Sequence, residues 1–180
     1  IASDFEMMAS NGLISKVLAG QRVFPDPVDD AGRWDWVSGA AALFSRECFS
    51  NIGLFDETYF LYYEETDLML RARRKGWEVW YEPAARVVHL GGASTTHCAS
   101  WPPEMTKMEI WRRSRAHYFR KNHGKAYAAA ADFAWVSGMI VRLLRSMLNG
   151  ADTRALRSDI AAFCRSQAGR PDRKTSASVS

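Results

Sequence analysis

The pattern of apolar and polar residues predicts helices towards both ends of this chain. Residues 1–20 carry apolar side chains at helical spacing and end at Gly20, so we expect a short helix there. Apolar periodicity returns in the last third of the chain. It predicts one helix that ends at Gly124, a second over residues 125–148 and a third over residues 152–166.

In the middle of the chain the pattern changes to short apolar runs separated by turn residues. Two prolines and a glycine predict a loop over residues 24–34. The compact apolar run that follows, residues 36–44, is typical of a buried strand. Ser45 is then a suitable N-cap for a short helix that stops at Gly53.

Residues 64–75 predict a helix with acids in its first turn and bases in its last, which suits the helix dipole at both ends. Leu68 and Ala72 lie four residues apart and form one core-facing stripe. Asp67 and Arg71 have the same spacing and can pair on another face.

Two short strands are expected after this helix, over residues 78–81 and 85–90. His89 ends the second strand and precedes two glycines. A histidine in this position is more often a hydrogen-bonded residue of the strand end. It could also bind a divalent metal through its neutral imidazole, and the residues alone leave both interpretations open.

Composition predicts one domain plus tails. The chain has 180 residues, 47% of them apolar, and a net charge of +4. Three widely spaced cysteines without a CxxC pair argue against a disulfide framework and a zinc site, and indicate a reducing compartment. Because the sequence begins without Met or a signal pattern, we expect an internal start.

The basic carboxyl-terminal part raises the question of its partner. Acids concentrate before residue 82, whereas the later residues are rich in Arg and Lys, which could meet nucleic acid or anionic lipid. For the basic, aromatic helix before Gly124, we favour docking on the domain over a nucleic-acid face. The longest apolar stretch, residues 126–141, is interrupted by Asp132, so we expect no classical membrane span.

The most reactive candidates are the acids at the start of the 64–75 helix. Acids there ordinarily just complement the helix dipole. Here three aromatic residues come directly before Glu64 and Glu65, and they could desolvate a carboxylate and raise its pKa towards that of a general base. Trp36 is either a core residue or a stacking surface for a sugar ring, and Gly39 and Ala40 are small enough to let a ligand approach the backbone.

Five motifs follow one another over about residues 34–94: SGA, IGLFDE, YEETDLMLR, GW and a run ending in His. In this order they resemble the carboxyl-terminal half of a family-2, GT-A-fold glycosyltransferase of the rhamnosyltransferase-like kind. The implied fold class is α/β, with α-helices after the half-domain. The implied organisation is an acceptor-side part over residues 1–100, a helical extension over 101–168 and a disordered tail over 169–180.

The resemblance also implies a reaction and its residues. Such enzymes transfer a sugar from a nucleotide-diphosphate sugar to an acceptor hydroxyl, usually with inversion. Glu65 matches the general base, where the family usually has Asp, and Glu64 matches its supporting acid. His89 matches a residue that contacts the metal or the diphosphate. The substrate-binding side of the cleft is assigned to Trp36, Ser38, Gly39, Ala40, Asp67 and Arg71, with Asp67 in a supporting role.

The resemblance further implies a divalent cation, Mg or Mn, and a glycan or lipid-linked acceptor for surface polysaccharide or glycolipid. The family's nucleotide-binding half should precede residue 1, so we expect the isolated chain to be incomplete and inactive. The alternative is a non-catalytic module that binds a glycan or lipid acceptor. We expect a cytoplasmic location, with peripheral contact to the inner face of the membrane through residues 107–148, and no nucleic-acid partner.

Overall fold

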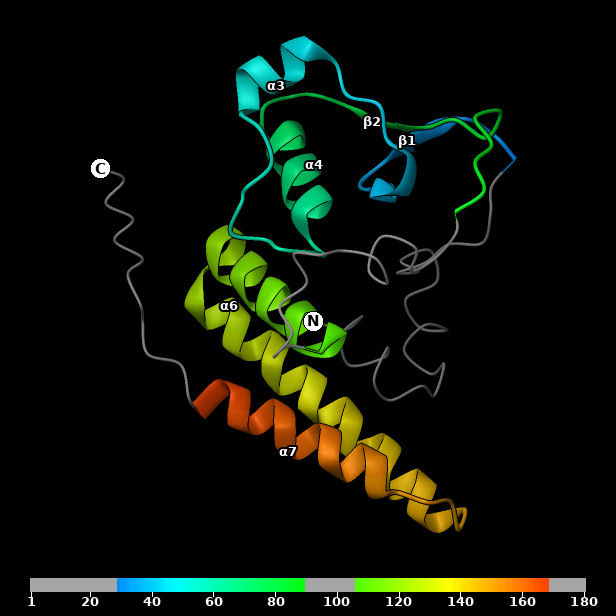
Figure 1. The fold of residues 1–180 in the computed structure, drawn as a ribbon, viewed down its shortest axis with the longest axis vertical. Helices are drawn as coiled ribbons and strands as arrows, with labels where there is room; N and C mark the ends of the chain where they lie inside the picture. The colour runs from blue at the N-terminus through cyan, green and yellow to red at the C-terminus, as the bar shows by residue number, and fades with distance from the viewer. Residues whose placement is uncertain (1–28, 90–105, 169–180) are drawn as a thin grey trace. The chain divides into compact units, whose positions relative to one another are not determined.

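The computed structural model describes residues 29–89 and 106–168 (Figure 1). The chain divides into two compact units, one of Phe24–Ala128 and the other of Ile1–Val23 with Ala129–Ser180. The expected helix over residues 1–20 and the expected disordered tail lie outside the described residues. The domain boundary expected after residue 100 stays a prediction.

The first unit contains a two-stranded antiparallel ribbon, β1 (Gly32–Trp34) and β2 (Val79–Tyr81). Gly32 is opposite Tyr81 and Trp34 is opposite Val79. Trp34 packs edge-on against the Tyr81 ring at 6.1 Å. The strand expected over residues 78–81 is thus confirmed, whereas the loop expected over 24–34 is wrong at its end, because residues 32–34 pair with β2.

Two other expected strands are wrong. Residues 36–44 contain the 3-10 helix η1 (Gly39–Ala41), because the Ser38 side chain accepts a hydrogen bond from the Ala40 backbone and starts a turn there. Residues 85–89 form no strand, and Leu90 lies outside the described residues. Val87 and Val88 are exposed, and no strand in the described ranges pairs with them.

Helix α3 (Arg46–Ile52) is confirmed with both of its predicted ends. The Ser45 hydroxyl accepts a hydrogen bond from Cys48 N at 3.0 Å, which satisfies one of the free N–H groups of the first turn. Gly53 ends the helix with φ of 79°, a left-handed conformation that favours glycine.

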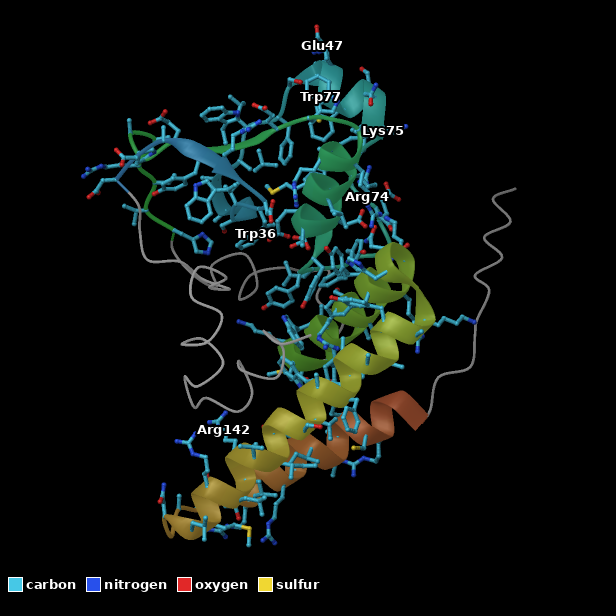
Figure 2. The ribbon with its side chains drawn as sticks, turned by 180° about the vertical axis from the view of Figure 1, so that it is seen from behind. Trp36, Glu47, Arg74, Lys75, Trp77 and Arg142 are labelled. Carbon is cyan, nitrogen blue, oxygen red and sulfur yellow. The ribbon has the colours of Figure 1, made fainter. Side chains whose placement is uncertain are left out.

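Helix α4 (Glu64–Arg74) is also confirmed, and it supplies much of the core of this unit. Leu68 and Ala72 are buried as the spacing predicted, and Met69 beside them is buried too. The Met69 sulfur lies 3.4 Å from Val37 N, so the segment after β1 runs along α4. Figure 2 shows Trp36 on this segment, beside α4.

Helix α6 (Lys107–Leu148) begins with a capping box and is interrupted at Gly124, which has φ of 85°. Glu109 accepts from Thr106 N at 2.7 Å, while Thr106 Oγ1 accepts from Glu109 N at 3.2 Å. The predicted stop at Gly124 is therefore confirmed as a break. Within the first unit, Ser114 Oγ donates to Leu61 O at 2.7 Å, which confirms that this basic helix docks on the domain.

In the second unit, the last part of α6 runs beside α7 (Arg154–Ala168), as expected for the third helix (Figure 1). Trp135 stacks on Phe163 with ring centroids 6.3 Å apart, and both side chains are buried. Helix α6 is long and apolar enough to cross a membrane by length and composition, but the core helix of a soluble protein passes the same criterion. The expectation of no classical membrane span therefore stays a prediction.

Candidate active site

The two acids singled out from the sequence, Glu64 and Glu65, are the first residues of α4. Tyr62 and Tyr63 lead into the helix with φ of 68° and 69°, a left-handed conformation that costs a non-glycine residue roughly 1–2 kcal/mol. Strain of this kind persists only where surrounding contacts hold it. The Tyr63 ring meets three rings of α6, those of Trp111, Tyr118 and Phe119.

The Glu65 side chain packs closely against Gly39, which comes 26 residues earlier in the chain. A Cβ atom added to Gly39 would lie 3.1 Å from Glu65 Cγ and 3.2 Å from its Cβ. Only glycine permits this approach without a shift of the acid. The structure therefore brings together two residues that the sequence assigned to one cleft, Gly39 from η1 and Glu65 from α4.

Three polar atoms around this region are buried without a hydrogen-bond partner: Glu64 Oε2, Glu65 Oε2 and Trp36 Nε1. A buried polar atom without a partner is costly, so each such atom in a native protein needs an explanation. Hydroxyl groups of a bound ligand would supply the missing partners, because a sugar hydroxyl can donate to a carboxylate and accept from an indole N–H.

Burial, together with the neighbouring negative charge of Glu65, raises the pKa of the Glu64 carboxyl group. Burial disfavours the charged form of an acid, and a second acid nearby disfavours it further. Desolvation of an acid in this cluster was the expectation from the preceding aromatics, and the pKa shift falls on Glu64.

Asp67 differs from Glu64, because its carboxylate is surrounded by hydrogen-bond donors. Its side chain is fully buried, yet it accepts hydrogen bonds from four groups: Arg71 Nε at 2.9 Å, Lys121 Nζ at 2.8 Å, Asn122 Nδ2 at 2.7 Å and the Tyr59 hydroxyl at 3.3 Å. Burial alone would raise the pKa of Asp67, but these donors outweigh it and lower the pKa. We call this set, with Asp56, the Asp67 network.

Lys121 joins the network to the loop before α4. Its ammonium group bridges Asp67 and Asp56, with Nζ 2.8 Å from Oδ2 of each. His117 Nε2 also lies 3.1 Å from Asp56 Oδ2. Despite partial burial, these contacts and the bond from Thr58 N hold the pKa of Asp56 well below its usual range. The start of α6 is thereby tied to the loop and to α4.

Arg71 extends the scaffold to α3. Besides its predicted ion pair with Asp67, it donates to the backbone carbonyls of Ile52 and Leu54. The polar groups of Asp67 and Arg71 are thus engaged by protein partners. Both side chains hold neighbouring elements together, and their assignment to the substrate-binding side of the cleft stays a prediction.

The remaining candidates lie apart from this scaffold. Ser38 and Ala40 are exposed residues of the η1 turn beside Gly39. His89 is exposed in an irregular segment. No group of three or more His, Cys, Asp or Glu within residues 29–89 and 106–168 could hold a metal ion. The described residues therefore do not form a divalent-cation site by themselves, and we assign no chemical step to a cation.

Sequence reasoning missed three residues of α6: Lys121 and Asn122, which donate to Asp67, and His117, which contacts Asp56. Basic and amide side chains on a helix usually face solvent, and nothing local marks these three as exceptions.

A hollow of about 570 Å³ lies elsewhere, lined by Phe44, Arg46, Phe49, Ser50 and Leu54. It contains none of the predicted site residues, so we place the candidate site at the acids.

Comparisons with known proteins point to one family. The family model described as "Glycosyltransferase like family 2" matches residues 22–118, which include the acids, the η1 turn and the part of the Asp67 network before α6. A 60-residue stretch is 43% identical to N-acetylglucosaminyl-diphospho-decaprenol L-rhamnosyltransferase of Mycobacterium tuberculosis, covering 33% of this chain and 20% of that protein.

A second relative is the rhamnosyltransferase WbbL of Escherichia coli, 29% identical over 89 residues, which cover 49% of this chain and 32% of that protein. The matches therefore span between a fifth and a third of the length of these relatives. No solved structure matches the chain.

Proposed function

This chain belongs to glycosyltransferase family 2, whose domain has the GT-A fold, and from this premise we propose that it is the acceptor-side part of an inverting sugar transferase. The donor is a nucleotide-diphosphate sugar. The acceptor is a hydroxyl group of a glycan or lipid-linked glycan used for surface polysaccharide or glycolipid. The mycobacterial relative is named as a rhamnosyltransferase of a diphospho-decaprenol compound, which supports the lipid-linked form.

The observation that carries the proposal is the buried, unpartnered carboxylate oxygen of Glu65 beneath Gly39. Glu65 accepts the proton of the acceptor hydroxyl as general base. The hydroxyl oxygen then forms a bond to the anomeric carbon while the bond from that carbon to the diphosphate oxygen breaks. The nucleoside diphosphate leaves with the bonding electrons, and the configuration at the anomeric carbon inverts.

Neighbouring residues hold the acceptor and the base. Glu64, whose pKa is raised, forms a hydrogen bond with a second hydroxyl group of the acceptor and orients Glu65. The indole N–H of Trp36, buried without a partner, donates to the acceptor sugar. Gly39 leaves room for Glu65, and the Asp67 network fixes the start of α4 against α6. This arrangement supports positioning of the base, on which transfer rates depend steeply.

The donor side belongs to residues outside this chain in our proposal. We expect Mg or Mn at the diphosphate there, with His89 as a contact, and a cytoplasmic location beside the membrane. The isolated chain is expected to be inactive for the same reason. These are proposals that rest on family membership and not on the described geometry.

Glu65→Gln in the full-length protein tests the assignment. We expect sugar transfer to be lost while binding of the nucleotide sugar, measured by calorimetry, is unchanged, because the amide keeps the shape but cannot accept the proton. Glu57→Gln, an exposed acid of the preceding loop, is the matched control and should transfer normally. Normal turnover of Glu65→Gln would refute Glu65 as the base. Acceptor binding without any transfer by the wild-type protein would favour the non-catalytic module.

A further inference from the structure

The outer face of α6 in the second unit carries a stripe of exposed apolar side chains. Its members are large, apolar and between 44% and 87% exposed: Phe133, Ile140, Leu144, Met147 and Leu148. Their spacing of seven, four, three and one residues places them on one side of an α-helix, within an arc of roughly 100°. We call this set the α6 stripe.

The α6 stripe is not the face that packs inside this unit. Ala131, Ala134, Trp135 and Met139 are buried on the opposite side of the helix, and Trp135 stacks on Phe163 of α7. No charged residue falls within the arc of the stripe between Phe133 and Leu148, because the acid and the arginines of this segment lie at other helical angles. The stripe is therefore an uncharged apolar surface open to solvent.

The surroundings of this surface are basic. Residues 129–168 contain five arginines and three aspartates. Arg157 of α7 reaches the end of the stripe, with its Nη2 atom 3.7 Å from the Met147 sulfur. Arg142 (Figure 2) is exposed, but helical spacing places it about 170° from the middle of the stripe, on the other side of α6. A basic side chain beside an apolar stripe complements a surface that is apolar inside and anionic at its edge.

We propose that the α6 stripe binds an anionic phospholipid surface, with α6 lying in the plane of the interface. The apolar side chains enter the boundary between headgroups and acyl chains, while Arg157 meets lipid phosphates. A crossing orientation is disfavoured, because the other side of α6 packs on α7 and carries Arg142. A second copy of the chain fits less well, since pairing two such faces would bring like-charged arginines together.

The size of the effect follows from the side chains. Full burial of one large apolar side chain is worth about 1.5–3 kcal/mol, so removing Phe133 or Leu144 should weaken binding by roughly tenfold or more each. Each arginine near an anionic surface contributes about 1 kcal/mol, which is roughly fivefold, and that part is sensitive to salt. The inference uses residues outside the candidate active site and is independent of the reaction proposed there.

Vesicle sedimentation of the full chain tests the proposal. Phosphatidylcholine vesicles are compared with vesicles that also contain phosphatidylglycerol, at low and high salt. We expect binding to the anionic vesicles that falls with salt. Binding should be lost in Phe133→Ser/Leu144→Ser and weakened, with a smaller salt effect, in Arg157→Gln. Leu43→Ser, a fully exposed leucine of the first unit, is the matched control and should bind as wild type.

Three results would overturn the membrane assignment. The first is no binding of the wild-type chain to anionic vesicles. The second is binding that survives Phe133→Ser/Leu144→Ser or is lost equally in Leu43→Ser. The third is a wild-type dimer in light scattering that the stripe variant dissociates, without any vesicle binding, which would assign the face to a second copy of the chain. Circular dichroism of each variant confirms that the helices are retained.

Discussion

Asp67→Asn should destabilise the first unit by about 3 kcal/mol, although it changes a single atom type. Asparagine keeps the shape of the side chain but removes the charge that faces Arg71 and Lys121, both at hydrogen-bond distance. Breaking a buried ion pair by removal of one partner costs about 3–5 kcal/mol. We take the lower end, because the Arg71 and Lys121 side chains are 21% and 31% exposed and regain some hydration.

Urea unfolding followed by circular dichroism measures this loss, as a fall in the transition midpoint at unchanged slope. The matched control is Asp35→Asn, which breaks the ion pair of Asp35 with Arg73. That pair is even closer, at 2.6 Å, but Asp35 is 83% exposed. An exposed pair is worth about 0–1 kcal/mol. If Asp67→Asn lost no more stability than Asp35→Asn, burial of the network would not be what strengthens it.

Acid should remove the same stabilisation. The folded-state pKa values of Asp67 and Asp56 are lowered, whereas an unfolded Asp titrates near 3.9. The native state therefore binds fewer protons, and the contribution is fully present above about pH 5 and is lost as pH falls through about 4 towards the lowered values. We expect the stability of the wild type to fall below pH 4, and Asp67→Asn to show a shallower fall in the same urea titration.

Three smaller changes test other parts of the structure. Gly39→Ala should lower transfer by about threefold to tenfold with little loss of stability, because a methyl group 3.1 Å from Glu65 Cγ must displace the base by a few tenths of an ångström; kcat and unfolding are measured together. Ser45→Ala should cost about 1 kcal/mol in thermal unfolding, because Cys48 N loses its acceptor. Glu64→Gln should raise stability at pH 7 but not below about pH 4, where the pH lies below both the folded and the unfolded pKa and the acid is neutral in both states; unchanged stability at pH 7 would contradict the raised pKa.

Predictions from sequence succeeded where the rule involved only neighbours in the chain. The Ser45 cap, the Gly53 stop and the ion pair between Asp67 and Arg71 each depend on residues within one or two turns of helix. They failed for the strand expected over residues 36–44. Apolar character alone does not distinguish a strand from an exposed turn, since a strand needs a partner, and β1 finds its partner 45 residues later.

The sequence by itself determined α3, α4, the break in α6, α7 and the family, because caps, stops, periodicity and the ordered motifs around Glu64 and Glu65 are local patterns. Tertiary structure decided which atoms meet. The Gly39 backbone packs against the Glu65 side chain. Lys121 bridges Asp67 and Asp56, which are 54 and 65 residues away in sequence. Such contacts depend on how helices pack, and packing is set by the whole core and not by the residues beside each partner.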